Sequence, residues 1–536
     1  MQLTLPFEVL CLAKLLNDHN FEAYLVGGAV RDLFIAHSLD SANQPPLIMD
    51  YDLTTNATPD QIKQLLPDSY YENQFGTVSL THKSWLDQLA LAKYQVPVET
   101  MQTQLTNLAV NNRQNRLIDL ARATKIHTSL KPVIAQDDAP QNLDQILVHP
   151  FEITTFRTDG TYEDHRRPSA VTWGKSIQDD LMRRDFTINA IAIKLDSKWL
   201  DQNLKNLELN STYSLTEVDF EIIDPHHGRA DIEAKIIQTV GDANERFRED
   251  ALRMLRAIRL SVQLDISISP DTLAAISQNH QLLGHVSGER IRDEFLKMLQ
   301  SHQPDKAIEI MAQTGLLSQF LPELVETQGV EQGGHHTTDV WTHSLDALAS
   351  CPSFDPIVRL ATLLHDIAKP ATYESRGGQI TFYNHEIIGS RMASQIGQRL
   401  RLSRKQRDRL FLLVRQHMFH YQPQNTDSSV RRFMRNVGLE NIDDILDLRE
   451  GDRLGSGARK TSWRLEEFKD RMIDQLNQPL DVTDLAINGT DLMRELNLKP
   501  GPILGKILQN LFDLVMDDPE LNDKQVLLTK AKELLK

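Results

Sequence analysis

The chain has 536 residues, of which 40% are apolar and 25% are charged, and its formal net charge is −16 at pH 7. This length is too great for one compact core, and the composition excludes fibrous and disordered proteins, so we expect several globular domains. The acidic balance argues against broad, non-specific nucleic-acid binding, but it does not exclude a locally basic surface.

The sequence predicts a cytoplasmic protein. No run reaches the eighteen apolar residues that a membrane helix needs, and the apolar N-terminal stretch carries Glu8 too early for a secretion signal. Cys11 and Cys351 lie far apart and match no metal or disulfide spacing, so we expect two buried free thiols.

The first part of the chain alternates between strand and helix patterns. Apolar runs that end in turn residues predict strands, and apolar residues at helical spacing predict helices. A Gln- and Asn-rich stretch without periodicity, roughly 85–145, interrupts the pattern and is interpreted as an insertion. The predicted strands are 21–28, 49–55, 75–83 and 148–157, and the predicted helices are 29–37 and 59–66.

Two aspartates in the second predicted strand indicate a metal site. Alternate residues of a strand share a face, so Asp50 and Asp52 project together. Neighbouring carboxylates repel each other unless a cation lies between them, and Mg²⁺ prefers hard oxygen ligands together with substrate phosphates. Glu152, in the last of these strands, is a candidate third carboxylate.

The turn before the first predicted helix suits an anion. Gly27 and Gly28 lie where the strand passes into the helix, so backbone N–H groups can approach a phosphate at the helix N-terminus. Arg31, in the first helical turn, can add a bidentate phosphate contact. A glycine turn, an arginine and paired acids in this order indicate a nucleoside triphosphate held against metal ions.

These motifs closely resemble those of the class II tRNA nucleotidyltransferases and bacterial poly(A) polymerases, members of the polymerase-beta-like superfamily. The resemblance rests on LVGGAVRD, DYDLTT, FEITTFRTDG, DLMRRDFTINAIAI, GDANERFREDALRMLRAIRL and SGERIRDEF, and covers most of residues 20–300. It implies that Asp50 and Asp52 bind two Mg²⁺ ions and that Glu152 positions or deprotonates the attacking hydroxyl. The residues that it implies for nucleotide binding are Gly28, Arg31, Arg184, Asp185, Asn189, Asp250, Arg253 and Arg256.

Asp250 and Arg253 offer a physical basis for choosing a base. They stand three apart in a predicted helix, 246–264, and therefore share one face. Cytosine and adenine present an amino donor beside a ring-nitrogen acceptor, which Asp250 and Arg253 match, whereas uracil and guanine present the opposite polarity. Glu249 is placed to support Arg253. Without the resemblance, this pattern would be interpreted as a surface ion pair.

The chain departs from the family pattern in two places. The family usually has Gly-Gly after DP and one further residue, whereas this chain reads DPHHG, with His226 and His227 and only Gly228 retained. If that turn flexes between C and A addition, the bulkier histidine would restrict it. The insertion before Glu152 is the second departure, and it would alter the path of the tRNA.

A second group of metal-ligand residues begins near residue 335. Histidines and aspartates follow in the order H…HD…H…H…D, which resembles the HD-type metal-dependent phosphohydrolases. Imidazole and carboxylate suit a divalent transition metal or Mg²⁺, and such a metal supports attack on a phosphoester. The resemblance implies activities such as phosphatase or 2′,3′-cyclic phosphodiesterase, and leaves the metal's identity open. The implied ligands are His343, His365, Asp366, His385, His417 and Asp452.

A basic stretch follows within this region. Ten lysine and arginine residues lie between Arg399 and Arg435, against two acids, Asp408 and Asp427. A solvated helix face and a phosphate-contacting patch are equally typical of such a run, and both interpretations stay open.

The predicted fold class is α+β. A nucleotidyltransferase head with a mixed or antiparallel sheet and helices is followed by all-helical domains. We expect a head over 1–235, a neck for base and RNA binding over 236–325, an HD domain over 326–460 and a helical tail over 461–536.

The leading functional prediction is a CCA-adding enzyme, which joins C, C and A to tRNA 3′ ends from CTP and ATP without a template. An A-adding enzyme stays open. A poly(A) polymerase typically has a strongly basic tail, which 460–536 lacks, and a CC-adding enzyme typically lacks the loop that 158–173 supplies here. A phosphohydrolase whose N-terminal half only binds RNA is disfavoured, because all three carboxylates are present. The predicted partner is tRNA, with no membrane; the sequence does not indicate the oligomeric state.

Overall fold

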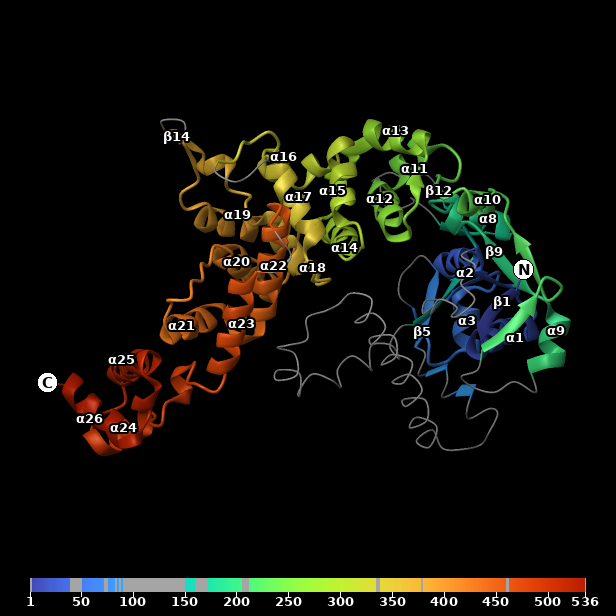
Figure 1. Ribbon diagram of the computed structural model, residues 1–536. Coiled ribbons are helices and arrows are strands. Elements are labelled where there is room, and N and C mark those ends of the chain that lie inside the picture. Colours follow the sequence, from blue (N-terminus) through green and yellow to red (C-terminus); the bar gives the residue numbers. More distant parts are fainter. Residues whose placement is uncertain are drawn as a thin grey trace. The chain divides into compact units, whose positions relative to one another are not determined.

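We describe the chain from a computed structural model, drawn in Figure 1. It divides into two compact units, Met1–Phe320 and Leu321–Lys536. The finer boundaries predicted at 235 and 460 stay predictions. The structure describes residues 2–38, 51–71, 76–81, 84–85, 88–89, 150–159, 171–174, 176–204, 212–333, 338–376, 379–458 and 462–535. Nearly all of the predicted insertion lies outside these ranges.

The first unit is built on a seven-stranded mixed sheet. β3 and β6 run parallel, and all other neighbours in the sheet are antiparallel. The sheet confirms the predicted α+β class, and the four strands predicted from the sequence are β2, β3, β5 and β6. In spatial order the strands are β11 (Phe220–Ile223), β9 (Ala192–Leu195), β2 (Ala23–Val26), β3 (Asp52–Thr55), β6 (Pro150–Thr155), β5 (Thr77–Thr81) and β4 (Tyr70–Tyr71).

Strand β6 shows why these residues form a sheet. Phe151 and Ile153 are fully buried, whereas Glu152 and Thr154 are partly exposed. Because successive strand residues face opposite sides, this alternation buries one face and leaves Glu152 on the other. The two faces therefore separate the packing of the core from the chemistry of the site.

The two helices predicted beside the sheet are confirmed. α2 (Gly28–Ser38) follows the glycine turn, and α3 (Pro59–Leu65) begins with a capping box from Thr58 and with Pro59 in its first turn. The other helices near the sheet are α1 (Phe7–Asp18), α8 (Ile177–Met182), α9 (Ser197–Asn203) and α10 (Gly228–Glu233), with the 3₁₀ turn η1 (Thr187–Asn189).

The prediction of one continuous helix over 246–264 is wrong. α11 (Ala243–Glu249) ends before Asp250, and α12 (Leu252–Leu264) begins after it. Asp250 is extended, with φ −143° and ψ 105°, and its Oδ1 accepts a hydrogen bond from the Leu252 backbone N–H at 3.1 Å. A short carboxylate that bonds the backbone two residues on competes with helical hydrogen bonding, which accounts for the break.

Helices complete the first unit, together with three short strand pairs. The helices are α13 (Pro270–Asn279), α14 (Gly288–Leu299) and α15 (Pro304–Gln313). The pairs are β1 (Gln2–Pro6) with β10 (Thr212–Thr216), β7 (Arg157–Asp159) with β8 (Val171–Trp173), and β12 (Ile236–Ile237) with β13 (Ser267–Ile268).

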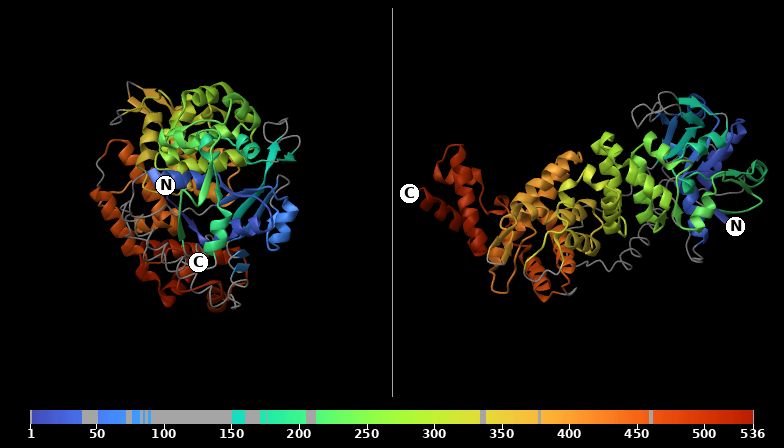
Figure 2. Two further views of the ribbon diagram at one scale, coloured as in Figure 1. Left: turned by 90° about the vertical axis from the view of Figure 1, so that its right-hand side faces the viewer. Right: turned by 90° about the horizontal axis from the view of Figure 1, so that it is seen from above.

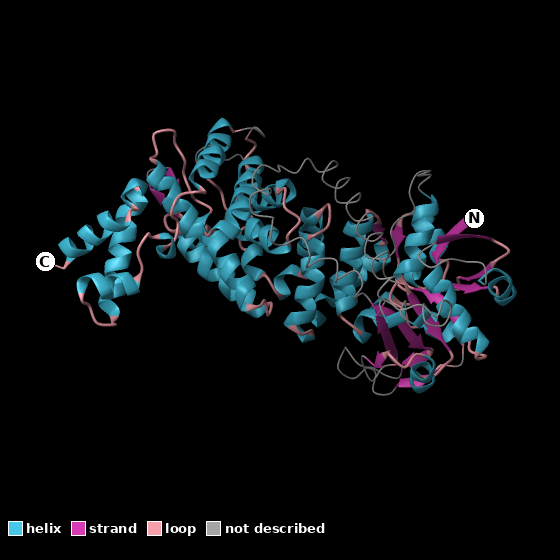
Figure 3. Cartoon of the chain, turned by 90° about the horizontal axis from the view of Figure 1, so that it is seen from below, coloured by secondary structure: helices cyan, strands magenta, loops and turns pink. Residues whose placement is uncertain are grey.

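The second unit is almost entirely helical, as Figure 3 shows by colour. Its one described hairpin joins β14 (Glu374–Arg376) to β15 (Gln379–Thr381). Among all the residues the structure describes, no helix is both long and apolar enough to cross a membrane. The helices are α16 (Pro322–Val325), α17 (Val340–Ser350), α18 (Pro356–Leu364), α19 (His385–Arg399), α20 (Arg404–Gln416), α21 (Asp427–Val437), α22 (Ile442–Gly455) and α23 (Trp463–Gln475).

The last three helices, drawn in red in Figure 2, pack around their own apolar cluster. They are α24 (Gly489–Leu496), α25 (Pro502–Asp517) and α26 (Lys524–Leu534). Arg431 of α21 is 3% exposed and donates to the Met516 carbonyl at 2.8 Å, at the end of α25. A cation suits the negative C-terminal end of a helix, so this arginine fastens α25 to α21.

Two glycines bring α22 against α17. A Cβ atom on Gly451 would lie 2.7 Å from the Ala347 carbonyl oxygen, and one on Gly455 would lie 2.6 Å from the Ala347 nitrogen. These distances are too short for any other residue, so the two backbones pack in direct contact. Asp452, next to Gly451, is thereby held close to α17.

We expect Gly451→Ala to destabilise the protein by about 1–3 kcal/mol, because the added methyl group overpacks a backbone contact. Gly505→Ala is the matched control, since a Cβ at Gly505 of α25 meets nothing within 4 Å. Alanine in an open helical position should stabilise by about 0.5–1 kcal/mol. Urea unfolding of both variants checks the prediction, and equal stability changes would contradict it.

Candidate functional site

The glycine turn of the first unit is in close contact with charged side chains. Gly27 has φ +77°, and a Cβ there would lie 3.0 Å from Asp52 Oδ2 and 3.4 Å from Arg184 Nη1. Only glycine adopts this conformation without strain and leaves room for both groups. The end of β2, a carboxylate and a guanidinium therefore meet at the start of α2.

The pairing of β3 with β6 aligns two of the three predicted carboxylates. Asp52 is the direct partner of Glu152 in this parallel pair. Paired residues of adjacent parallel strands point to the same face, with the strands about 4.8 Å apart. Asp50, the third carboxylate, lies outside the described residues. Two hard oxygen ligands at one level of a sheet fit the requirement of Mg²⁺.

Basic and amide side chains converge on the same turn. Arg31 Nη1 donates to Asn189 Oδ1 at 3.0 Å, and Arg184 Nη1 lies 3.4 Å from the Asn189 carbonyl oxygen. Asn189 belongs to η1, and Arg31 to the first turn of α2, which begins at Gly28. Four of the residues predicted to hold the nucleotide thus lie together.

Asp180 is a residue that the sequence interpretation missed. Its side chain is fully buried, and it accepts from Arg183 Nη2 at 2.5 Å and Arg184 Nη2 at 3.2 Å. Burial favours its neutral form, but the two arginines outweigh burial and lower the pKa of this carboxyl. Asp180 therefore orients Arg184 toward Gly27. In the sequence DDLMRR, Asp180 resembles an ordinary acidic residue near the start of a helix. No feature of the sequence therefore indicated that Asp180 orients Arg184.

Asp185 is held within the protein. Its carboxylate accepts from the Phe186 N–H at 2.9 Å and from Asn189 Nδ2 at 3.3 Å, and it pairs with Arg256 Nη2 at 3.1 Å. Burial opposes its charge, but Arg256 and Arg253 outweigh burial and lower the pKa of Asp185. The buried Asp185 and the partly exposed Arg256 thus form an ion pair beside η1.

The two predicted base-selecting residues each have a charged partner. Arg253 Nη1 lies 2.5 Å from Glu249, as predicted, and Arg290 of α14 donates to both oxygens of Asp250 at 3.2 and 2.7 Å. Asp250 lies at the break between α11 and α12. The prediction that Asp250 and Arg253 share one face of a helix is therefore wrong. Arg290 was missed, because its role depends on a contact between distant helices.

The structure shows how the turn accommodates a histidine where the family usually has a glycine. His227 has φ +58° and precedes α10, so it adopts the left-handed conformation that glycine usually supplies. Gly228 is required for space, since a Cβ there would lie 2.1 Å from the Thr187 carbonyl oxygen. The turn therefore packs directly against η1.

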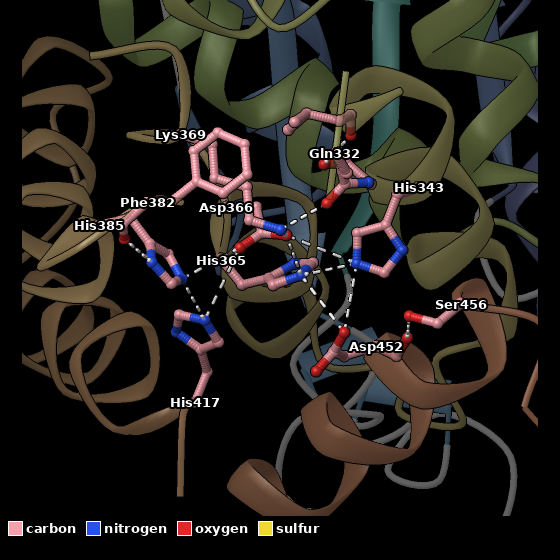
Figure 4. Close-up of polar contacts among 12 residues, drawn as sticks. Gln332, His343, His365, Asp366, Lys369, Phe382, His385, His417, Asp452 and Ser456 are labelled. Carbon is pink, nitrogen blue, oxygen red and sulfur yellow. Dashed lines mark hydrogen bonds and ion pairs between the residues drawn. The ribbon is translucent and has the colours of Figure 1, made fainter. Parts of the chain in front are cut away.

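The six residues predicted to bind the second metal come together in the second unit, as Figure 4 shows. They come from α17, the turn after α18, the start of α19, the end of α20, and α22. Asp366 lies at the centre: Oδ2 is 3.2 Å from His365 Nε2, and Oδ1 is 3.3 Å from His385 Nε2. The cluster, hereafter the histidine–aspartate cluster, is His343, His365, Asp366, His385, His417 and Asp452.

Hydrogen bonds orient the imidazoles of this cluster. Nδ1 of His365, His385 and His417 lies 2.7, 2.8 and 2.8 Å from the carbonyl oxygen three residues earlier. The Nδ1–H group therefore donates to the backbone, and Nε2 faces the cluster. His385 Nε2 and His417 Nε2 are 3.3 Å apart, and His343 Nε2 and His365 Nε2 are 3.1 Å apart. Nitrogen atoms this close need a proton or a cation between them, so these residues fit a divalent metal.

The charges in the cluster are strongly coupled. Burial opposes the charge of Asp366, but His365 and Lys369 outweigh burial and hold its pKa well below the usual value. Burial also opposes protonation of His365, yet Asp366 and Asp452 raise its pKa. Burial and repulsion from His365 lower the pKa of His417 to about 3. A neutral imidazole and an ionised carboxylate are the forms that bind metals.

A pocket of about 560 Å³ opens onto this cluster. Beyond the ligands it contains cationic and aromatic side chains that the sequence interpretation missed. Lys369 Nζ lies 2.6 Å from Asp366 Oδ2, and Arg449 Nη1 lies 2.6 Å from Asp452 Oδ2. Each carboxylate of the cluster therefore has a cationic partner at the pocket.

Seven arginines of the basic stretch 399–435 have intramolecular partners. Some of these ion pairs lie at the surface, with the Arg404 side chain 90% and the Arg432 side chain 55% exposed, so both interpretations of the stretch stay predictions. The pairs are Arg399 with Glu323, Arg404 with Asp408, Arg409 with Asp355 and Asp444, Arg415 with Glu386, Arg431 with the Met516 carbonyl, Arg432 with Asp517, and Arg435 with Asp513.

Three family models match the chain. The poly A polymerase head domain matches residues 23–123 and 124–238. The probable RNA and SrmB-binding site of polymerase A matches 265–327, and a putative tRNA nucleotidyltransferase domain 2 matches 400–531.

The chain is also similar to individual CCA-adding and A-adding enzymes. A CCA-adding enzyme of Pediococcus pentosaceus is 30% identical over 72% of this chain and 80% of that enzyme. A CCA-adding enzyme of Geobacillus thermodenitrificans is 34% identical over 60% of this chain, and the chain spans little more than half of that relative, 56%. An A-adding tRNA nucleotidyltransferase of Deinococcus radiodurans is 31% identical over 63% of this chain and 74% of that enzyme.

Among solved structures, the chain is similar to a CCA-adding enzyme of Bacillus stearothermophilus in complex with CTP. The TM-score is 0.59 with 24% identity, over 98% of this chain and 97% of that one. This likeness concerns the fold.

We expect Asp180→Asn to destabilise the protein by about 3 kcal/mol at neutral pH, because it leaves two arginines beside a buried, uncharged group. The folded-state pKa of Asp180 is below its ordinary value of 3.8. Its contribution is therefore complete above about pH 4 and is lost as pH falls through the folded pKa. Asp179→Asn, at the exposed neighbour, is the control and should cost about 0.5 kcal/mol or less. Urea unfolding at pH 7 and pH 3 tests both; an equal cost for the two variants would be evidence against the role of Asp180.

Proposed function

Because this chain belongs to the family of class II tRNA nucleotidyltransferases and poly(A) polymerases, we propose that it is a CCA-adding enzyme. It would extend tRNA 3′ ends with C, C and A from CTP and ATP. The observation that carries the proposal is the alignment of Asp52 with Glu152, beside Gly27 and Arg184. The relatives named as CCA-adding enzymes support this choice.

The groups around the glycine turn suit nucleotidyl transfer. The tRNA 3′-oxygen forms a bond to the α-phosphorus, the bond to the bridging oxygen of the β-phosphate breaks, and pyrophosphate leaves. Glu152 accepts the proton of the 3′-hydroxyl, or holds that hydroxyl in place. Arg31 and Arg184 orient the triphosphate at the start of α2. When bound, Mg²⁺ supplies positive charge for the phosphates, and Asp52 with Asp50 would hold it.

Base selection is assigned to Asp250 and Arg253. Asp250 would accept from the amino group shared by cytosine and adenine, and Arg253 would donate to the adjacent ring nitrogen. Glu249 and Arg290 hold these side chains in place through the ion pairs described above. Preorganised polar groups of this kind discriminate strongly, since a wrong base leaves them unpaired.

A second candidate function, hydrolysis of a phosphoester, is favoured by the histidine–aspartate cluster. Its six residues and neutral His417 suit a divalent metal, which would supply the charge needed for attack by water. In hydrolysis, a water oxygen bonds to phosphorus and the ester oxygen leaves with a proton.

The primary test uses the purified protein with Mg²⁺, CTP, ATP and three tRNAs, which end before CCA, after C and after CC. We expect all three to be extended to a complete CCA end, resolved at single-nucleotide length. Extension of only the CC-ending tRNA would instead establish an A-adding enzyme. Long adenosine tails would establish a poly(A) polymerase, and no extension would overturn the proposed transfer activity.

The two sites can be separated by substitution. Asp52→Ala should abolish nucleotide addition by removing a carboxylate from the transfer site, while hydrolysis of a 2′,3′-cyclic nucleotide remains. Asp366→Ala should do the reverse, since Asp366 belongs to the second cluster. Parallel assays of both reactions with Mg²⁺, Mn²⁺ and Ni²⁺ measure this. Loss of both activities in either well-folded variant would contradict two independent sites.

A further inference from the structure

Arg246 of α11 contacts the carboxylate that pairs with Arg253. Arg246 Nη2 lies 2.9 Å from Glu249 Oε1, and Arg253 Nη1 lies 2.5 Å from the other oxygen, Oε2. The side chains of Arg246, Glu249 and Arg253 are 16%, 21% and 11% exposed, so water reaches these contacts only in part. Glu249 therefore bridges two arginines, one on each oxygen atom. Hydrogen bonds between charged groups are the stronger ones, so the two contacts together fix the direction of this carboxylate.

The backbone of Arg246 contacts Arg253 as well. The Arg246 carbonyl oxygen accepts a hydrogen bond from Arg253 Nη1 at 3.1 Å, and the Arg183 carbonyl oxygen accepts one from Arg253 Nη2 at 3.3 Å. Together with the bond to Glu249, these contacts engage three of the five N–H donors of the guanidinium. Three acceptors on two nitrogen atoms define the plane of the guanidinium. These neighbours therefore set the direction in which Arg253 can donate to a base.

Arg246 also contacts the segment that leads to the glycine turn. Arg246 Nη1 donates to the Met182 carbonyl oxygen at 3.4 Å. Met182 is the last residue of α8, and the final carbonyl groups of a helix have no partner within the helix. Two residues later, Arg184 Nη1 lies 3.4 Å from the place that a Cβ atom on Gly27 would take. Arg246 thus connects the contacts of Arg253 with the segment that brings Arg184 to the turn.

We propose that Arg246 is a positioning residue for base selection, and that it acts on Arg253 through Glu249. The inference rests on the proposed nucleotidyl transfer and adds a residue that determines its specificity. Arginine suits this position because its planar fork reaches two acceptors in different directions, here a carboxylate and a backbone carbonyl. Without the guanidinium, Glu249 loses one of its two arginine partners, and the direction of Arg253 is less well fixed. Uracil, which presents the opposite polarity to cytosine, is then rejected less strongly.

The test measures discrimination between CTP and UTP. The value of kcat/KM for each nucleotide is determined with a tRNA that ends before CCA, for the wild type and for Arg246→Met, which keeps an apolar stem and removes the guanidinium. We expect the CTP-to-UTP ratio of kcat/KM to fall about tenfold, as loss of one charge-assisted hydrogen bond does. Arg248→Met, at an exposed position of the same helix, is the matched control and should leave the ratio unchanged.

A merely structural role gives a different result. It lowers kcat/KM for both nucleotides by the same factor, so an unchanged ratio in Arg246→Met would overturn the inference. Glu249→Gln, alone and combined with Arg246→Met, tests the route. If Arg246 acts through Glu249, the double variant has the same ratio as Glu249→Gln alone, whereas effects that multiply would contradict this route.

Binding measurements separate this inference from the proposed transfer. If the wild type incorporates neither nucleotide, the transfer proposal fails, and calorimetry of CTP and UTP binding then decides the role of Arg246. A preference for CTP that is about tenfold weaker in Arg246→Met than in the wild type would support this role. Equal preferences in the two proteins, including no preference in either, would refute it.

Discussion

The site of the first unit depends on the parallel pairing of β3 with β6. This pairing places Asp52 and Glu152 side by side, although a long segment of chain separates them. The left-handed turn at Gly27 then brings Arg184 and the start of α2 to the same edge. Without this register, the acids and the phosphate-binding turn would not form one site.

In both units, several buried or partly buried charged side chains form ion pairs. Asp180 holds Arg183 and Arg184, Arg256 holds Asp185, and Arg290 holds Asp250. Each pair offsets the cost of removing a charge from water and also sets the direction of a side chain that faces the proposed nucleotide. In the second unit, the buried Asp366 lies among four imidazoles and Lys369. Orientation of a few charged groups is thus the common physical feature of the two sites.

Close contact between backbone segments also positions elements of both sites. Gly228 allows the turn before α10 to lie against η1, and Gly451 allows α22 to lie against α17. In both cases the glycine stands next to a functional element: η1 carries Asn189, and α22 carries Asp452. His227 shows that the left-handed position of this turn tolerates a side chain. The space for a side chain is limited at the next residue, Gly228, where a Cβ atom would overlap the Thr187 carbonyl group.

The sequence by itself determined the strands β2, β3, β5 and β6, the helices α2 and α3, the α+β class and the residue types of both sites, because periodicity, capping and motif spacing are local properties. It also identified the six residues of the histidine–aspartate cluster, whose order carries the pattern. It did not determine the helix break at Asp250, the contacts of Asp180 and Arg290, or the partners of the basic stretch. Tertiary structure decided these, because each depends on contacts between segments far apart in the chain, and such contacts leave no periodic signal in the sequence.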